Sequence, residues 1–87
     1  MNVIKLESFL ATVDCGTVSA AALKLNIGQP AVSKHLNALE DDFGVALFDR
    51  SSRRTTLSPE GGVKVLHVAR LVVRAMKALR EELPECH

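Results

Sequence analysis

Apolar residues recur every three or four positions along most of this 87-residue chain, the spacing of one face of an α-helix. The first such run consists of Leu6, Phe9, Leu10 and Val13. Asn2 is placed to cap the start of this helix, and Gly16 is placed to end it in a left-handed conformation. The pattern therefore predicts a first helix between these two residues.

The stretch from Thr17 to Leu39 predicts a short helix, a tight turn and a second helix, at about residues 18–37. Thr17 or Ser19 can cap the shorter helix. Its predicted inner face consists of Val18, Ala21, Ala22 and Leu25. Asn26-Ile27-Gly28 fits the turn, because asparagine tolerates a positive φ and glycine removes bulk. Pro30 then fits the first helical position, where its missing N–H costs nothing.

The helix that begins at Pro30 has two chemically different faces. One is apolar and comprises Val32, Leu36, Leu39 and Phe43. The other is polar, compact and free of acidic residues, and it comprises Gln29, Pro30, Ser33, Lys34 and Asn37. Glutamine can pair with adenine through two hydrogen bonds, and serine and lysine can contact bases or phosphates. An ordinary exposed helix face is the alternative, but the preceding helix and tight turn favour a helix that contacts DNA in the major groove.

The pattern changes after Gly44. The short apolar run Val45–Phe48, a polar segment and the β-prone Thr55–Leu57 together predict a small hairpin over about residues 46–57. Arg53 and Arg54 would lie at or near its tip, where arginine suits the DNA backbone or the minor groove. A disordered basic loop is the alternative.

Ser58-Pro59-Glu60 is a helix start, with a cap, a proline and an acid in the first turn, and Pro84 is a helix breaker. We therefore divide the chain into a DNA-binding domain (1–58), a long linker helix (59–83) and a tail (84–87). The linker helix carries two adjacent apolar stripes. One stripe can pack against the rest of the domain, and the second then needs another surface to cover it. We predict dimerisation through Val65, Leu66, Val68, Ala69, Val72, Val73, Ala75, Met76 and Leu79. The alternative is that a further domain covers the second stripe.

Composition limits the classes of function. The hydrophobic content is 47% with no tryptophan or tyrosine, which suits a small domain of packed helices. The net charge is only +1, but the basic residues concentrate in residues 50–80, where Glu60 is the one acid. Cys15 and Cys86 have no metal-binding spacing, and no metal or other cofactor is expected. No membrane segment or signal peptide is apparent, so we expect a cytoplasmic protein.

An enzyme is not expected. His35 and His67 are the internal histidines, and no carboxylate or nucleophile constellation accompanies either of them. We interpret His35 as a packing residue or a phosphate contact, and His67 as a surface group of the linker helix.

From about Leu6 to Leu83 the chain resembles the N-terminal DNA-binding region of LysR-type transcriptional regulators. The most specific matches are QPAVSKHLNALE, which begins at Gln29, and FGVALFDRSSRRTTLSPEG, which begins at Phe43. The resemblance implies a mainly α fold, a winged helix-turn-helix of three helices and a β-hairpin wing, followed by a long dimerisation helix. It also implies a homodimer that binds an interrupted inverted repeat in double-stranded DNA.

By the same resemblance, Gln29, Pro30 and Ser33 match recognition-helix contacts, and Arg53 matches the wing contact. Lys34 keeps a positive charge where arginine is also common. Our full set of predicted DNA contacts is Ser19, Gln29, Pro30, Ser33, Lys34, Asn37, Arg50, Arg53 and Arg54. Two positions depart from the family pattern: Ala20 replaces a residue that is often basic, and Gly28 replaces a serine or threonine cap.

The family also carries a large C-terminal effector-binding domain, which lies outside this sequence. A small-molecule inducer would act only through that domain, and a longer protein could assemble into a tetramer. The alternative function is a helical homodimerisation or interaction module without DNA recognition. The polar face from Gln29 to Asn37 distinguishes the two, because a pure dimerisation module would not require it.

Overall fold

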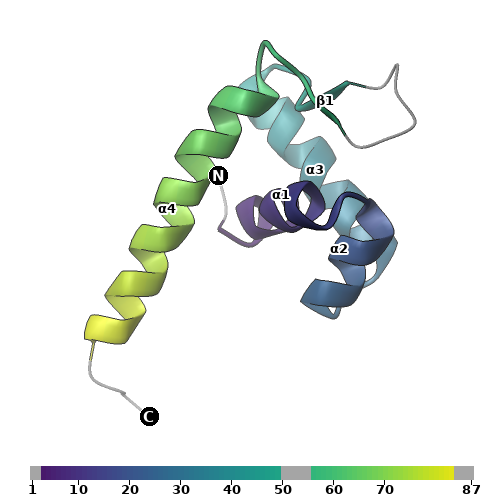
Figure 1. Cartoon of the computed structure of the whole chain (residues 1–87). Helices are drawn as coiled ribbons and strands as arrows, with labels where there is room; N and C mark the ends of the chain where they lie inside the picture. Colours follow the sequence, from purple (N-terminus) through teal and green to yellow (C-terminus); the bar gives the residue numbers. More distant parts are fainter. Residues whose placement is uncertain (1–2, 50–55, 84–87) are drawn as a thin grey trace.

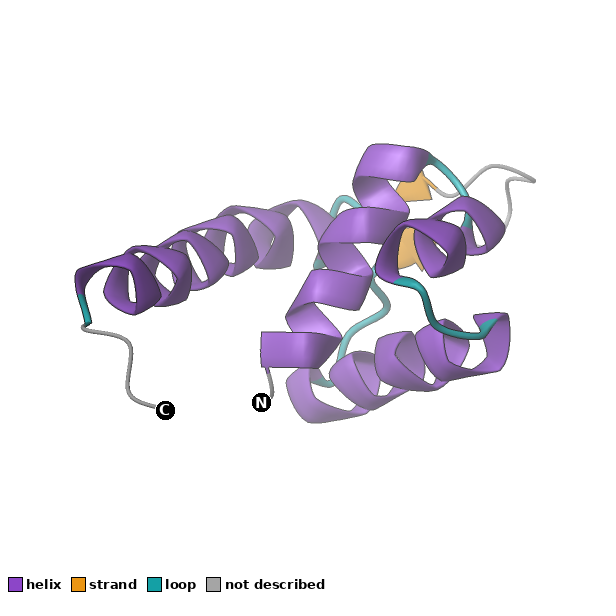
Figure 2. Ribbon diagram, turned by 90° about the horizontal axis from the view of Figure 1, so that it is seen from below, coloured by secondary structure: helices purple, strands orange, loops and turns teal. Residues whose placement is uncertain are grey.

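The computed structural model describes residues 3–49 and 56–83. Its described elements are the helices α1 (Val3–Cys15), α2 (Val18–Leu25), α3 (Gln29–Phe43) and α4 (Gly62–Glu82), and the strands β1 (Phe48–Asp49) and β2 (Thr56–Leu57). Helices α1, α2 and α3 form a compact unit, and α4 extends away from it as a rod (Figures 1 and 2). The mainly helical fold with a small hairpin is as the sequence predicted.

The ends of α1 and α2 and the start of α3 lie at the residues that the pattern indicated, whereas α3 continues to Phe43, beyond the predicted end of the motif at about residue 37. Gly16 follows α1 with φ of +87°, and Asn26 follows α2 with φ of +58°. Thr17 caps α2, since its Oγ1 accepts a hydrogen bond of 3.1 Å from the Ala20 amide. Gly28 is the N-cap of α3, and Pro30 lies in its first turn. The predicted turn chemistry is therefore confirmed.

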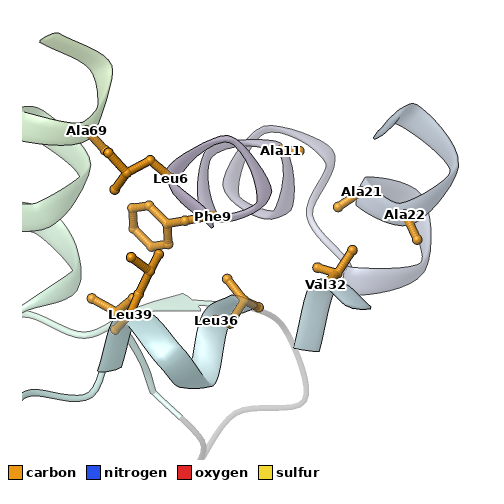
Figure 3. Close-up of a cluster of buried hydrophobic side chains, with 10 residues drawn as sticks. Leu6, Phe9, Ala11, Ala21, Ala22, Val32, Leu36, Leu39 and Ala69 are labelled. Carbon is orange, nitrogen blue, oxygen red and sulfur yellow. The ribbon is translucent and has the colours of Figure 1, made fainter. Parts of the chain in front are cut away.

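The core lies where the three short helices meet α4 and the base of the hairpin. Leu6 and Phe9 of α1 point toward Leu39 of α3 and Ala69 of α4 (Figure 3). The Phe9 ring also packs against Phe48 of β1 with a centroid distance of 5.5 Å. Burial of each large apolar side chain stabilises a fold by about 1.5–3 kcal/mol, so this cluster holds α3 firmly against α1.

Two sequence expectations need correction. Phe43 was assigned to the apolar face of α3, but its side chain is 40% exposed at the end of that helix. The long helix was expected to begin at Pro59, but α4 begins at Gly62. The Ser58 side chain is buried, donates a 2.6 Å hydrogen bond to the Ala46 carbonyl and accepts one of 2.9 Å from the Gly62 amide. Ser58 Oγ also accepts a 3.3 Å hydrogen bond from the Gly61 amide, so Ser58 caps this turn and ties it to the hairpin. Gly61 itself has a non-helical φ of −136°, and α4 begins after it.

The apolar stripes of α4 also divide differently from the prediction. Ala69 was assigned to the dimer surface, but it is only 1% exposed and packs within the core of its own chain. Four further residues of that set pack partly against the same core, namely Val65, Leu66, Val72 and Val73. Periodicity detected both stripes but could not say which one faces the domain. The stripe left outward includes Leu71, which the sequence reasoning missed.

Candidate nucleic-acid interface

The second helix of the helix-turn-helix, α3, is buried on one face and exposed on the other. Its apolar face is buried through Val32, Leu36 and Leu39. Its opposite side presents every residue of the predicted polar face, and all of these are exposed: Gln29, Pro30, Ser33, Lys34 and Asn37. The structure therefore brings these five candidates together on one helix, with no acidic residue before Glu40.

The geometry of this face suits a DNA groove. Gln29, Ser33 and Asn37 are each four residues apart, so they form a line with a rise of about 6 Å per step. An α-helix fits the major groove, which is about 12 Å wide. Ser19, the predicted contact outside α3, is also exposed and lies on α2. Glutamine, serine and lysine in this arrangement can contact base edges, while Asn37 and Ser19 can contact the sugar-phosphate backbone.

The hairpin begins beside the C-terminal end of α3. Its strands pair antiparallel, with Phe48 opposite Leu57 and Asp49 opposite Thr56. Glu40 of α3 accepts a 2.8 Å hydrogen bond from the Leu47 amide through Oε2. This bond fixes the base of the hairpin relative to α3. The predicted wing contacts Arg50, Arg53 and Arg54 lie outside the described residues, as do Asn2 and Cys86.

A contact between α1 and α3 was not predicted. Ser8 Oγ lies 2.7 Å from His35 Nδ1 in a hydrogen bond that spans 27 residues of sequence. The Ser8 side chain is fully buried, and the half-buried His35 lies on α3 behind the polar face. Sequence reasoning placed His35 in packing or on phosphate, but a serine on another helix gave no signal of its pairing. Glu40 was missed for the same reason, since its partner is a backbone amide seven residues away.

An ion pair between Arg70 and Asp14 links the N-terminal unit to α4. Arg70 donates 2.8 Å to Asp14, whose side chain is 42% exposed. This hydrogen bond, opposed by partial burial and aided by the positive charge of Arg70, holds the pKa of the Asp14 carboxyl below its usual range. The pKa of the Arg70 guanidinium is raised by the same bond. Because the pair is exposed, its contribution to stability is small.

Helix α4 leaves a row of apolar side chains exposed. Val68 is 52% exposed, Leu71 is 53% exposed and Leu79 is 47% exposed, and Ala75 lies between them in sequence. These four residues, which we call the outer stripe, are spaced by three or four positions and so share one side of the helix. Single exposed leucines are ordinary, but a continuous row on a rod-like helix is typical of a contact surface.

Within residues 3–49 and 56–83, no group of three or more histidine, cysteine, aspartate or glutamate side chains could hold a metal ion. None of the helices in the same ranges combines the length and apolar character needed to cross a membrane.

Comparisons with known proteins agree on one family. Residues 4–62 match the model of the bacterial regulatory helix-turn-helix proteins of the lysR family. The chain is 36% identical over 92 residues to the HTH-type transcriptional regulator ClcR of Pseudomonas putida, covering 98% of this chain and 31% of that protein. It is 44% identical over 61 residues to TfdS of Cupriavidus pinatubonensis, covering 70% of this chain and 21% of TfdS. The chain thus spans at most about a third of these two relatives.

Solved structures give the same result. The complex of the CbnR DNA-binding domain with DNA matches at a TM-score of 0.84 and 32% identity, over 93% of this chain and 92% of that one. The complex of the BenM DNA-binding domain with benA site 1 DNA matches at a TM-score of 0.85 and 30% identity, over 93% and 90%. Both similarities extend through nearly the whole of each chain.

Proposed function

This chain belongs to the lysR family of bacterial helix-turn-helix regulators, and we propose that it is the part of a transcriptional regulator that recognises a specific DNA sequence. The observation that carries the proposal is the one-sided burial of α3. Its polar, acid-free face is exposed at five positions, while its apolar face is locked into the core. The similarity to two DNA-binding domains solved with DNA supports the same function.

In the proposed complex, α3 lies in the major groove with its N-terminal end toward the bases. Gln29 pairs with a base edge, Ser33 contacts a base or a phosphate, and Pro30 packs against a base or sugar. Lys34 contributes a positive charge to a guanine or a phosphate. The arginines predicted for the wing, Arg50, Arg53 and Arg54, would contact the backbone or minor groove and set the register.

We propose further that two copies associate through α4. The outer stripe of Val68, Leu71, Ala75 and Leu79 is the surface that α4 leaves uncovered. A two-fold pair of such helices would bury these side chains against their equivalents. The two copies of α3 would then lie about one DNA turn, or a multiple of it, apart. This spacing would select an interrupted inverted repeat.

The relatives are about three to five times as long as the part of them that this chain matches, so the full regulator is expected to be longer. We propose that a C-terminal effector domain follows α4 in the full protein, binds the inducer and allows further assembly into a tetramer. The proposed place of action is the bacterial cytoplasm, where the promoters lie. An enzymatic role has no support from the family or from the residues at the interface.

A helical self-association module is the competing function. The outer stripe of α4 fits both functions, because a dimeric regulator and a simple dimer need the same apolar surface. The exposed Gln29, Ser33 and Asn37 are required only by DNA recognition. Selection of bound duplexes from a random DNA pool, at near-physiological salt, tests the proposal directly. An enriched inverted repeat is expected, whereas no enrichment by a folded dimer would favour the self-association module.

A further inference from the structure

We propose that Ser8 and His35 form a positioning pair that sets the rotation of α3 about its axis and so determines how sharply the polar face discriminates between DNA sequences. The inference rests on the proposed function. It begins from the 2.7 Å hydrogen bond between Ser8 Oγ and His35 Nδ1, which joins the helix that contacts DNA to the helix behind it. Neither residue belongs to the predicted contact face.

The position of His35 on α3 makes it suited to this role. It lies two residues from Ser33 and two from Asn37, which is about 200° around the helix from each. His35 is therefore on the back of α3 relative to the polar face. A constraint on the back of a helix controls the direction in which its front side chains point.

The other contacts between α1 and α3 in this region are mainly apolar and thus less directional. Phe9, Val32 and Leu36 are buried in one cluster, and apolar burial tolerates small rotations. A hydrogen bond restricts rotation more strongly, because its length is confined to a narrow range and it weakens steeply once its angle falls below about 120°. Side chains that contact bases must be held to within about 0.5 Å. The Ser8–His35 bond can supply this precision where apolar packing cannot.

Ser8 is a firm anchor for such a bond. Its side chain is fully buried, and its backbone carbonyl accepts a 2.8 Å hydrogen bond from Thr12 Oγ1 within α1. The bond to His35 can form in either direction, with the serine hydroxyl donating to an unprotonated Nδ1 or Nδ1–H donating to the serine oxygen. In both cases the bond holds the imidazole ring through its Nδ1 atom.

The test compares His35→Asn with His35→Leu. Asparagine places an oxygen or an amide nitrogen at the δ position and can therefore keep the bond in either direction. Leucine has a similar size and no polar atom, and it is the better helix former. A role limited to stability therefore predicts that the leucine variant is equal or better, whereas a positioning role predicts that the asparagine variant is better.

The measured quantity is the ratio of affinities for the duplex enriched from the random pool and for a scrambled duplex of equal length. We expect His35→Leu to lower this ratio about five- to tenfold, the effect of one lost neutral hydrogen bond, with scrambled-duplex affinity unchanged. His35→Asn should retain the ratio within about twofold. Ser8→Ala should reproduce the leucine effect, and adding His35→Leu to Ser8→Ala should lower the ratio no further.

The outcomes separate this inference from the proposed function. If the wild-type chain prefers no duplex, the proposed function fails and the inference falls with it. If the wild type discriminates and both Ser8→Ala and His35→Leu retain the full ratio while remaining folded, the inference alone is overturned. Equal loss on both duplexes would also overturn it, because that result would indicate general destabilisation.

Discussion

At the scale of single residues, the polar face of α3 combines groups that would contact DNA in different ways. Gln29 carries a donor and an acceptor on one rigid amide, which matches the edge of an adenine. Lys34 carries only donors on a flexible stem and acts as a mobile point charge. The first type distinguishes bases, and the second attracts any duplex. Substitutions at these two exposed residues should therefore change affinity in different ways.

Gln29→Ala should relax one position of the recognised site. The lost amide removes about 1–3 kcal/mol of discrimination at a single base pair and leaves the remaining positions unaffected. The measurement is competition between the enriched duplex and its single-base variants. Since Gln29 is exposed, the variant should keep its stability. Equal loss of affinity on every duplex would contradict a base contact.

Lys34→Gln provides the matched change on the same helix. It removes one positive charge, so affinity should fall about equally for all duplexes, and the slope of log affinity against log salt should shrink by about 1. The readout is binding measured across a salt series. A selective loss at one base pair with an unchanged salt slope would instead place Lys34 on a base.

At the scale of the elements, the caps of α3 are asymmetric. Gly28 caps its N-terminus with φ of −75° and no side-chain hydrogen bond, and a Cβ there would meet only Pro30 Cδ, at 3.5 Å. Gly44 caps its C-terminus with φ of +68°. Glycine is therefore required at the second position, which is left-handed, but not at the first.

Gly28→Ser should consequently stabilise the domain by about 0.5–1 kcal/mol. The hydroxyl can accept from an amide in the first turn, and the unfolded chain loses conformational freedom. Gly44→Ser is the control, and it should destabilise by about 1–2 kcal/mol because a side chain is unfavourable at positive φ. Urea unfolding of both variants gives the two free energies. A stabilising Gly44→Ser would refute the reasoning about φ.

The junction between α1 and α4 offers a test by pH. The Arg70 hydrogen bond lowers the pKa of Asp14 in the folded chain, so the pair adds stability above the unfolded pKa of about 3.9 and loses it as pH falls through the folded pKa. For this exposed pair the gain is about 0.2–1 kcal/mol. The difference in unfolding free energy between wild type and Asp14→Asn should therefore be present at pH 6 and shrink below about pH 4.

Arg70→Gln is the control variant, because it removes the same ion pair by changing the basic partner. The double variant should be about as stable as either single variant at pH 6. A difference between wild type and Asp14→Asn that stays constant down to pH 3 would mean that the carboxylate does not act through its charge.

The ends of the helices could be predicted where neighbouring residues in the sequence determine them, and not where packing between distant segments does. The helix-turn-helix could be predicted because Thr17, Asn26 and Pro30 each act on their own neighbours in sequence. The start of α4 could not, because Gly61 is non-helical and packs closely against Val45 and Ala46 from another segment, so the helix begins only at Gly62. A Cβ at Gly62 would collide with the Leu47 carbonyl, a constraint set by packing alone.

The same limit applies to the candidate site. The polar face of α3 follows from spacing within one helix, so the sequence predicted all five of its residues. The Ser8–His35 bond joins positions 27 residues apart and depends on the packing of α1 against α3. Similarly, the sequence contains both stripes of α4, but only the position of Ala69 beside Leu6 decides which stripe faces inward (Figure 3).

At the scale of the whole molecule, α4 is more exposed than the other three described helices. The outer stripe runs along a helix that extends beyond the three-helix unit, so one domain cannot cover it (Figure 2). A second copy of α4 would cover it and would also fix the distance between the two copies of α3. In the proposed dimer, one element would therefore link dimerisation to recognition of a spaced repeat.

Leu71→Glu tests this link. Leu71 is 53% exposed, so the variant should fold normally, but a dimer would place a glutamate from each copy in an apolar contact. Loss of about 1.5–3 kcal/mol of burial per copy should raise the dimer dissociation constant at least about a hundredfold. Sedimentation equilibrium measures this constant, and Leu71→Met, which keeps the apolar surface, should leave it nearly unchanged.

The same variant separates α4 from α3 in DNA binding. Leu71→Glu should bind the enriched inverted repeat no more tightly than a duplex with one half-site, because each copy would bind alone. Its preference for the half-site over a scrambled duplex should persist, since Gln29 and Ser33 are untouched. A dimer of unchanged strength would show that another surface holds the copies together, and the stripe would then be free for the effector domain proposed to follow α4.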